Sequence, residues 1–267
     1  MSMLYLIRLP VSLPALARWA ASRNYGWTTR RDRKGRECDT GFDEGRALHH
    51  LLVETFGQDM LNPFRLLVAS PGKRGHIYAY SHADAATLLE TAHACALPEV
   101  VDICDLAQLV AKTKHDNWRS GRRLGFEARV RPVGRLMKPL PHSGGSAFTK
   151  GAEVDVFLIE ALRRFPEATS AEENMLKAGR SREEVYAAWL AERLTGAATL
   201  EPGVRLTHFL RRRAARKGFA PEGPDATLQG NLIVLESVRF QELLAKGIGR
   251  HKAYGYGMVL LRPPRRA

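Results

Sequence analysis

Alternating hydrophobic and polar positions predict strands in both halves of the chain. The pattern is clearest in residues 122–133, where Leu124, Phe126 and Ala128 alternate with polar or small residues. One side of this strand is therefore expected to be buried, and its outward side is basic. Strands are expected at residues 3–9, 64–70, 76–81, 100–104, 122–133, 226–236 and 258–261.

Apolar positions at helical spacing separate these strands. Ser12, Asp43 and Asp84 stand where a helix N-cap is expected, and Gly57 stops the helix that follows Asp43. The predicted helices cover residues 12–22, 43–56, 84–95, 154–165 and 181–194, with a short one ending near Lys246.

The order of these elements indicates an α+β fold with two ferredoxin-like (RRM-like) domains in tandem. The first domain, residues 1–120, has the order strand, helices, strand, strand, helix, strand. The second, residues 121–267, carries an inserted helical segment at about residues 150–200 and a glycine-rich loop near its end. A length of 267 residues suits two small domains.

Charge is the unusual feature of the composition. The chain has 41 Lys and Arg against 28 Asp and Glu, a net charge of +13, which favours a polyanionic partner. Its three cysteines include no C-x-x-C pair, which fits reduced thiols in the cytoplasm and predicts neither a zinc nor a redox site. No apolar segment reaches 18 residues, so neither export nor membrane insertion is indicated.

Basic residues are concentrated in three segments. Residues 23–36 interleave six Lys or Arg with two aromatic residues, which fits either a solvated loop or contact with single-stranded nucleic acid. Residues 112–138 are read either as a polar surface strand or as a phosphate-binding face. Residues 204–219 contain the triple arginine 211–213 and favour an ordered phosphate track. Residues 153–193 are locally acidic and are an unfavourable place for phosphate.

The segment KGIGRHKAYGYGMVLL, residues 246–261, combines glycines, basic residues and tyrosines. Glycine lets a backbone approach a phosphate closely, although a plain glycine-rich turn before a buried strand is the alternative. G-x-G-x-x-G would need glycine at Lys252, and Gly-Lys-Ser/Thr is absent, so ATP and NAD binding are disfavoured.

This C-terminal segment resembles that of the CasE-type CRISPR-associated repeat-processing endoribonucleases of the RAMP superfamily. The resemblance rests on Gly247-Ile248-Gly249, Lys252-Ala253 and Gly255-Tyr256-Gly257 before the final strand. It extends to Leu48-His49 and to the strand 63–67 in the first half, and covers about 60% of the chain. The basic insert and the long helical segment leave open the corresponding enzyme of type IV CRISPR systems.

The resemblance implies an endoribonuclease that cuts the stem-loop of a CRISPR repeat transcript without metal or cofactor. It remains with the CRISPR RNA in an effector complex, and a catalytically inactive RNA-binding subunit is the alternative. His49 falls on the catalytic histidine, and an imidazole suits proton transfer to or from the reacting ribose. Arg46 stands where members often have a tyrosine, and Arg23 and Tyr25 are further candidates. The residues expected to bind RNA are Arg122, Arg123, Arg129, Arg211, Arg212, Arg213, Arg216, Lys217, Lys246, Gly247, Gly249, Arg250, Lys252, Tyr254 and Tyr256.

Overall fold

The structure is a computed structural model. It describes residues 3–25, 27–31, 37–69, 72–114, 118–141, 147–166, 170–213 and 222–265, and at 27–31, 37–41, 114 and 213 it describes the backbone alone. The chain divides into two compact units. The first contains residues 1–118, 213–221 and 237–259, and the second contains residues 119–212, 222–236 and 260–267. The first unit thus takes in a segment beyond the expected division at residue 120.

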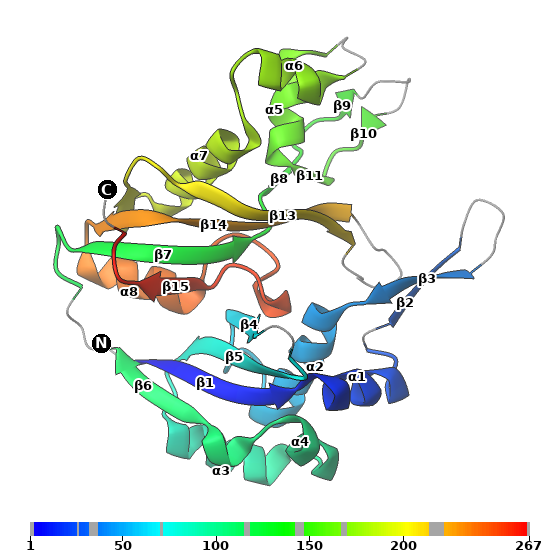
Figure 1. Cartoon of the computed structure of the whole chain (residues 1–267), viewed down its shortest axis with the longest axis vertical. Helices are drawn as coiled ribbons and strands as arrows, with labels where there is room; N and C mark the ends of the chain where they lie inside the picture. The colour runs from blue at the N-terminus through cyan, green and yellow to red at the C-terminus, as the bar shows by residue number, and fades with distance from the viewer. Residues whose placement is uncertain are drawn as a thin grey trace. The chain divides into compact units, whose positions relative to one another are not determined.

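The first unit is built on a four-stranded sheet with the order β4-β5-β1-β6 (Figure 1). Each neighbouring pair is antiparallel, and this order is the one that a ferredoxin-like unit gives its four strands. The strands are β1 (Leu4–Ser12), β4 (Phe64–Val68), β5 (Arg74–Ser81) and β6 (Val110–Lys114), and the helices are α1 (Leu13–Ser22), α2 (Glu44–Phe56), α3 (Ala85–Cys95), α4 (Pro98–Ile103), α8 (Ser237–Lys246) and the 3-10 turns η1 (Leu106–Gln108) and η2 (Lys252–Tyr254).

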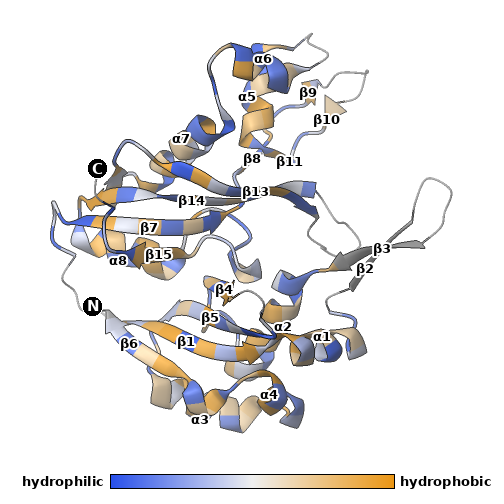
Figure 2. Ribbon diagram, viewed as in Figure 1, coloured by the Kyte–Doolittle hydropathy of each residue, from blue (hydrophilic) through white to orange (hydrophobic). Residues whose placement is uncertain are grey.

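One face of this sheet carries the hydrophobic core of the unit. Ile7, Leu9 and Val11 alternate along β1 and are buried against residues of α1, α2, α3 and α4. Figure 2 shows the hydrophobic residues of β1 as orange segments of the strand. Because side chains of a strand alternate between its two faces, this pattern fixes which side of the sheet the helices cover.

One expectation for the first unit is wrong, and one element was not expected. Residues 100–104 were expected as a strand because of their β-branched residues, but they belong to helix α4 and its C-cap. Pro98 supplies the φ angle of a first helical residue, and Val100 and Ile103, three residues apart, are both buried. The basic insert contains a strand that was not expected, since β2 (Trp27–Arg31) forms an antiparallel pair with β3 (Glu37–Phe42).

The second unit has a five-stranded sheet with the order β12-β14-β7-β15, and β13 also pairs with β14. Its strands are β7 (Arg123–Val130), β8 (Val133–Arg135), β9 (Leu140–Pro141), β10 (Ala147–Phe148), β11 (Glu153–Asp155), β12 (Ala198–Leu200), β13 (Arg205–Arg213), β14 (Glu222–Val234) and β15 (Val259–Arg262). The inserted helices are α5 (Val156–Arg164), α6 (Ala171–Lys177) and α7 (Arg182–Leu194). The fold is therefore α+β with two ferredoxin-like sheets and a helical insert, as the sequence predicts.

The outward side expected for β7 is largely covered. Glu127 and Arg131, which were expected to face solvent, are 6% and 3% exposed. Buried acids in this unit provide counter-charges: Arg129 forms an ion pair with Asp225 at 2.5 Å, and Arg262 forms one with Glu127 at 2.6 Å. This part of the predicted basic face is a set of internal ion pairs.

Candidate active site

Helix α2 presents His49 beside the core of the first unit. Its N-cap, Asp43, accepts a hydrogen bond at 3.0 Å from the backbone N–H of Arg46, as a side-chain cap does. Leu48, Leu51 and Leu52 are buried on one side of the helix. Arg46, His49 and His50 are half-buried at the margin of that side, where a charged or titratable group can reach a ligand.

The glycine-rich segment packs against the first turn of α2. A side-chain Cβ at Gly45 would lie 2.5 Å from the carbonyl oxygen of Tyr254, so only glycine permits this approach of η2 to the helix. The approach brings the rings of Tyr254 and His49 to a centroid distance of 5.4 Å. Residues about 200 positions apart in the sequence thus share one site.

The glycines of this segment are required by contacts within the protein. Gly247 has a φ of +68° and ends α8 by donating its N–H to the carbonyl of Leu243 at 2.8 Å. Gly257 has a φ of +82°, and a Cβ there would lie 2.3 Å from the carbonyl oxygen of Ile248. This packing indicates that the two glycines shape the backbone of the segment, and the shape of the segment fixes the position of Tyr254.

A second wall of the site is aromatic. The rings of Tyr25 and His50 are stacked with centroids 3.9 Å apart and an interplanar angle of 13°. The ring of His50 also lies 5.4 Å from that of His49, so these neighbouring histidines approach one another despite pointing differently from the helix. Tyr25 is held in turn against Trp19, at a centroid distance of 5.5 Å.

Arg23 and Glu54 hold this wall in place. Arg23 forms an ion pair with Glu54 at 3.1 Å, and its guanidinium lies 5.3 Å from the ring centre of Trp19. A hydrogen bond to the Glu54 carboxylate raises the pKa of Tyr25, so the phenol stays protonated at neutral pH. The contacts of Arg23 therefore suit a positioning residue.

The two histidines favour the neutral form. Burial lowers the pKa of His49, and the carboxylate of Asp59 opposes this only in part. Burial also lowers the pKa of His50, with further lowering from the positive charges of His49 and Arg46. At neutral pH both imidazoles are available as proton acceptors.

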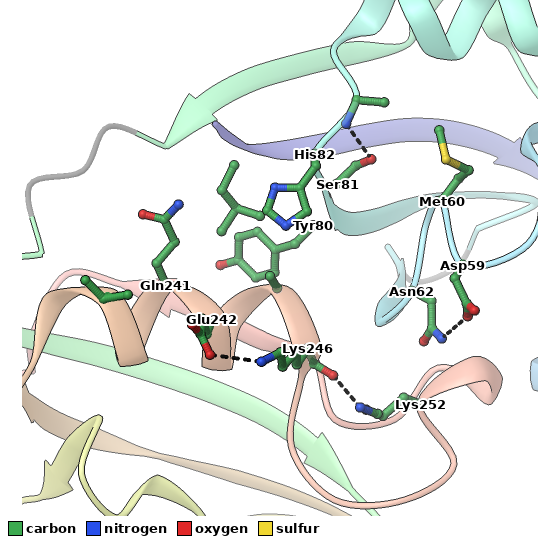
Figure 3. A pocket seen from close by; sticks show the side chains of 14 residues that line it. Asp59, Met60, Asn62, Tyr80, Ser81, His82, Gln241, Glu242, Lys246 and Lys252 are labelled. Carbon is green, nitrogen blue, oxygen red and sulfur yellow. Dashed lines mark hydrogen bonds and ion pairs between the residues drawn. The ribbon is translucent and has the colours of Figure 1, made fainter. Parts of the chain in front are cut away.

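A larger cavity of about 700 Å³ lies beside the same segment (Figure 3). Lys246 and Lys252 from the glycine-rich segment face His82 and the buried Tyr80 of the sheet, and Asp59 and Asn62 line both this cavity and the small hollow beside His49. Two of its cations already have partners. Lys246 pairs with Glu242 at 2.9 Å, and Lys252 donates a hydrogen bond at 2.6 Å to the carbonyl of Lys246.

The predicted RNA-binding residues fall in different places. Lys246, Gly247, Gly249, Arg250, Lys252, Tyr254 and Tyr256 belong to the first unit. Tyr256 is only 5% exposed, so its ring is packed inside the unit and offers no face to a base in this structure. Arg122, Arg123, Arg129, Arg211 and Arg212 belong to the second unit. Arg216, Lys217 and the side chain of Arg213 lie outside the described residues.

The described arginines of the second unit are mostly paired with carboxylates. Besides Arg129, Arg123 pairs with Glu201 at 2.8 Å, Arg211 pairs with Glu172 at 2.7 Å, and Arg212 pairs with Asp225 at 3.2 Å. Arg211 and Arg212 keep side chains that are 46% and 49% exposed. A phosphate would therefore compete with existing partners at these positions.

Sequence reasoning missed Gly45 and gave His50 a supporting role only. The signal for Gly45 was its place in the first turn of a well-capped helix, where glycine costs stability unless packing requires it. The contact between Tyr25 and His50 had no signal in the sequence spacing.

Within the described ranges, no three His, Cys, Asp or Glu residues are placed to hold a metal ion, and no helix is long and apolar enough to cross a membrane.

Two ferredoxin-like sheets in tandem, with His49 on α2, the second helix after β1, fit the repeat-associated class that the sequence resembles. The chain belongs to the CRISPR associated protein family, whose model matches residues 4–263. The resemblance drawn from the glycine-rich segment is confirmed. No curated protein matches the sequence.

Solved structures are similar to this chain in fold along its whole length. CRISPR endoribonuclease Cse3 bound to 19-nucleotide RNA has a TM-score of 0.57 at 18% identity, covering 98% of this chain and 100% of that chain. Thermus thermophilus Cse3 bound to an RNA representing a pre-cleavage complex has a TM-score of 0.56 at 17% identity, with the same coverage. Cas6e from Escherichia coli str. K-12 has a TM-score of 0.51 at 18% identity, covering 97% of this chain and 99% of that chain.

Proposed function

We propose that this protein is a CRISPR RNA maturation endoribonuclease. It binds the stem-loop of the repeat transcript and cuts one phosphodiester bond without metal. Membership of the CRISPR-associated family and the shared fold with Cse3, which is an endoribonuclease seen with RNA, support this function. The observation that carries it is the placing of His49, half-buried and neutral, beside Tyr254 of the glycine-rich segment.

His49 is proposed as the general base. It takes the proton from the 2′-hydroxyl next to the scissile bond, and the 2′-oxygen attacks the phosphorus. A bond forms between the 2′-oxygen and phosphorus while the bond to the 5′-oxygen breaks. The proton held by His49 is then available to the departing 5′-oxygen, and the products are a 2′,3′-cyclic phosphate and a 5′-hydroxyl. A depressed pKa suits this role, because the imidazole must begin neutral.

Arg46 is proposed to stabilise the charge that develops on the phosphorane. It lies three residues before His49, one helical turn away, and a guanidinium is too basic to exchange protons itself. Tyr25 and Arg23 are proposed as positioning residues. Tyr25 stacks on His50 and orients its ring, and Arg23 is held by its ion pair with Glu54. The cations of the glycine-rich segment and of β13 hold the RNA, and the protein stays with its product in an effector complex.

The test is cleavage of the CRISPR-repeat RNA of the same genome in EDTA, with the end groups mapped. Wild-type protein is expected to cut at one site and leave a cyclic phosphate. His49→Ala is expected to lower the rate by about 10²–10⁴-fold, the usual contribution of a general base. His93→Ala, an exposed histidine on α3, is the matched control and should cut at the wild-type rate.

Two further results decide between this proposal and its rival. An RNA with 2′-deoxyribose at the attacked position should bind and stay intact. Tight binding of ordinary repeat RNA with no cutting by the wild type would favour a catalytically inactive RNA-binding subunit. Cutting that requires added divalent metal would overturn the metal-independent mechanism.

A further inference from the structure

The helical insert of the second unit borders an open cavity of about 640 Å³, which is lined by α5, α7 and residues 134–136. Both helices are labelled in Figure 1. The residues of α5 that line it recur at helical spacing, from Val156 through Ile159 to Arg163, and α7 shows the same spacing from Val185 to Glu192. Each helix therefore turns one face to the cavity, apolar at its beginning and charged at its end.

Arginine dominates the charged lining. We call this site the arginine cavity, and its cations are Arg135, Arg163, Arg164, Arg180 and Arg193, against the acids Glu160 and Glu192. Arg180 pairs with Glu160 at 3.0 Å, and Arg193 approaches Glu192 at 3.5 Å. Arg163 and Arg164 are exposed and form no ion pair with any residue that the structure describes. The cavity thus has a surplus of positive charge.

Trp189 is the aromatic residue of the lining. Its side chain lines the cavity and is 95% buried, since the residue is 5% exposed. Its indole Nε1–H is buried and has no hydrogen-bond partner among the described atoms, as is also the case for Trp19, so the indole contributes its ring to the lining. The guanidinium of Arg193 stacks over the same ring at 3.9 Å.

Residues 153–193 hold more acids than bases, and the sequence therefore makes this segment an unfavourable place for phosphate. The lining of the cavity differs from the segment as a whole, because it includes Arg135 and only two of the acids. Asp155 and Glu172 are drawn into pairs with Arg182, and Glu172 also pairs with Arg211. Some acids of the segment therefore form ion pairs outside the cavity, while Arg163, Arg164 and Arg193 lie on the sides of α5 and α7 that line it.

Helix dipoles alone do not account for this arrangement. Arg163, Arg164 and Arg193 stand in the last turns of their helices, where cations are favourable, but Arg135 lies on β8 and Arg180 lies before α7. A cluster of guanidinium groups suits phosphate oxygens, which accept two parallel hydrogen bonds from one arginine. A hollow of this volume takes a group of nucleotide size and is too small for a helical duplex.

We propose that the arginine cavity binds a nucleotide of the single-stranded RNA that flanks the repeat hairpin. The inference rests on the proposed function, because it assumes an RNA substrate. It assigns the unpaired part of that substrate to the helical insert. The phosphate is held by Arg163 and Arg164.

The experiment compares two substitutions of equal charge. Arg163→Gln/Arg164→Gln removes two cations of the cavity, and Lys138→Gln/Lys177→Gln removes two exposed cations of the same unit that do not line it. Each protein is titrated with the bare repeat hairpin and with hairpins that carry about ten unpaired nucleotides on the 5′ or the 3′ side, a length typical of single-strand sites. Fluorescence anisotropy gives the affinities at several salt concentrations.

For the wild type, one tailed hairpin is expected to bind about tenfold more tightly than the bare one. The arginine double variant should lose that gain, and the salt slope of its log affinity should fall by about 1.4, the value for two phosphates of a single strand. The lysine double variant should keep both.

Cleavage of the bare hairpin separates this inference from the proposed function. The arginine double variant should cut it at the wild-type rate. If the wild type cuts the hairpin and the tail brings no arginine-dependent gain, the inference is overturned and the proposed function stands. If the wild type cuts nothing while the tail still binds through the cavity, the proposed function fails and the inference stands. Displacement of the tail by a polyglutamate peptide at equal charge concentration would indicate a protein partner and overturn the RNA assignment.

Discussion

Replacing Gly45 by alanine tests whether the approach of η2 to α2 builds the active site. The added Cβ would lie 2.5 Å from the carbonyl oxygen of Tyr254, 3.2 Å from its carbonyl carbon and 3.4 Å from its Cβ. Two of these atoms belong to the backbone, so no side-chain rotation relieves the contact. The turn must move by about 0.9 Å to restore an ordinary separation of 3.4 Å.

The expected change in stability is small because two effects oppose each other. Alanine in place of glycine in a helix stabilises by about 0.5–1 kcal/mol. Overpacking costs about 1–3 kcal/mol, so the free energy of unfolding should fall by no more than about 2.5 kcal/mol. The expected change in activity is larger, since a displacement of about 1 Å at a reacting group can cost about 10²-fold in rate.

Single-turnover cleavage of the repeat hairpin and thermal unfolding measure the two quantities separately. Gly203→Ala is the control, because Gly203 has a φ of +87° and open space around its Cβ direction, so it carries the backbone cost without a clash. It should lose stability and keep its cleavage rate. If Gly45→Ala cuts like the wild type and melts higher, Tyr254 does not need its place beside His49, and the account of the site is refuted.

Three further outcomes follow from the charges of the molecule. The cleavage rate should rise with pH and level off with a midpoint below 6.5, because burial lowers the pKa of His49 and the base must be neutral. A midpoint above 6.5 in the pH–rate profile would contradict this. Asp225→Asn should lower the free energy of unfolding by about 3 kcal/mol, because it leaves the half-buried Arg129 without its counter-charge. Urea titration measures this change, and an unchanged midpoint would mean that the ion pair is dispensable. Glu54→Gln should lower the pKa of Tyr25 in a spectrophotometric titration, because the carboxylate that favours the neutral phenol is removed. An unchanged pKa would mean that burial alone raises the pKa of Tyr25.

Local signals in the sequence were enough for most helices and strands. Asp43 and Asp84 cap α2 and α3 as expected, since a cap needs only residues three positions apart. Helix α4 was mistaken for a strand because its valines favour strands, and the decisive factors were Pro98 and the burial of residues against the sheet. Burial of that kind depends on the whole unit and leaves little trace in six residues.

The site was predictable in its residue types and less so in its contacts. His49 followed from the resemblance, but its pairing with Tyr254 joins positions about 200 residues apart, and no spacing rule connects them. The summed charge of residues 153–193 also does not describe the lining of the arginine cavity. A sum treats every side chain of a helix alike, whereas a helix turns some residues to one side and some to another.

The interleaving of the two units along the chain has a consequence for synthesis of the protein. The first unit is assembled from three stretches of sequence, and residues 237–259 are made last. A truncated product ending near residue 120 would carry His49 but neither Tyr254 nor Val259, whose carbonyl accepts the hydrogen bond of Tyr80 at 3.0 Å. Almost the whole chain must therefore be synthesised before Tyr254 can take its place beside His49.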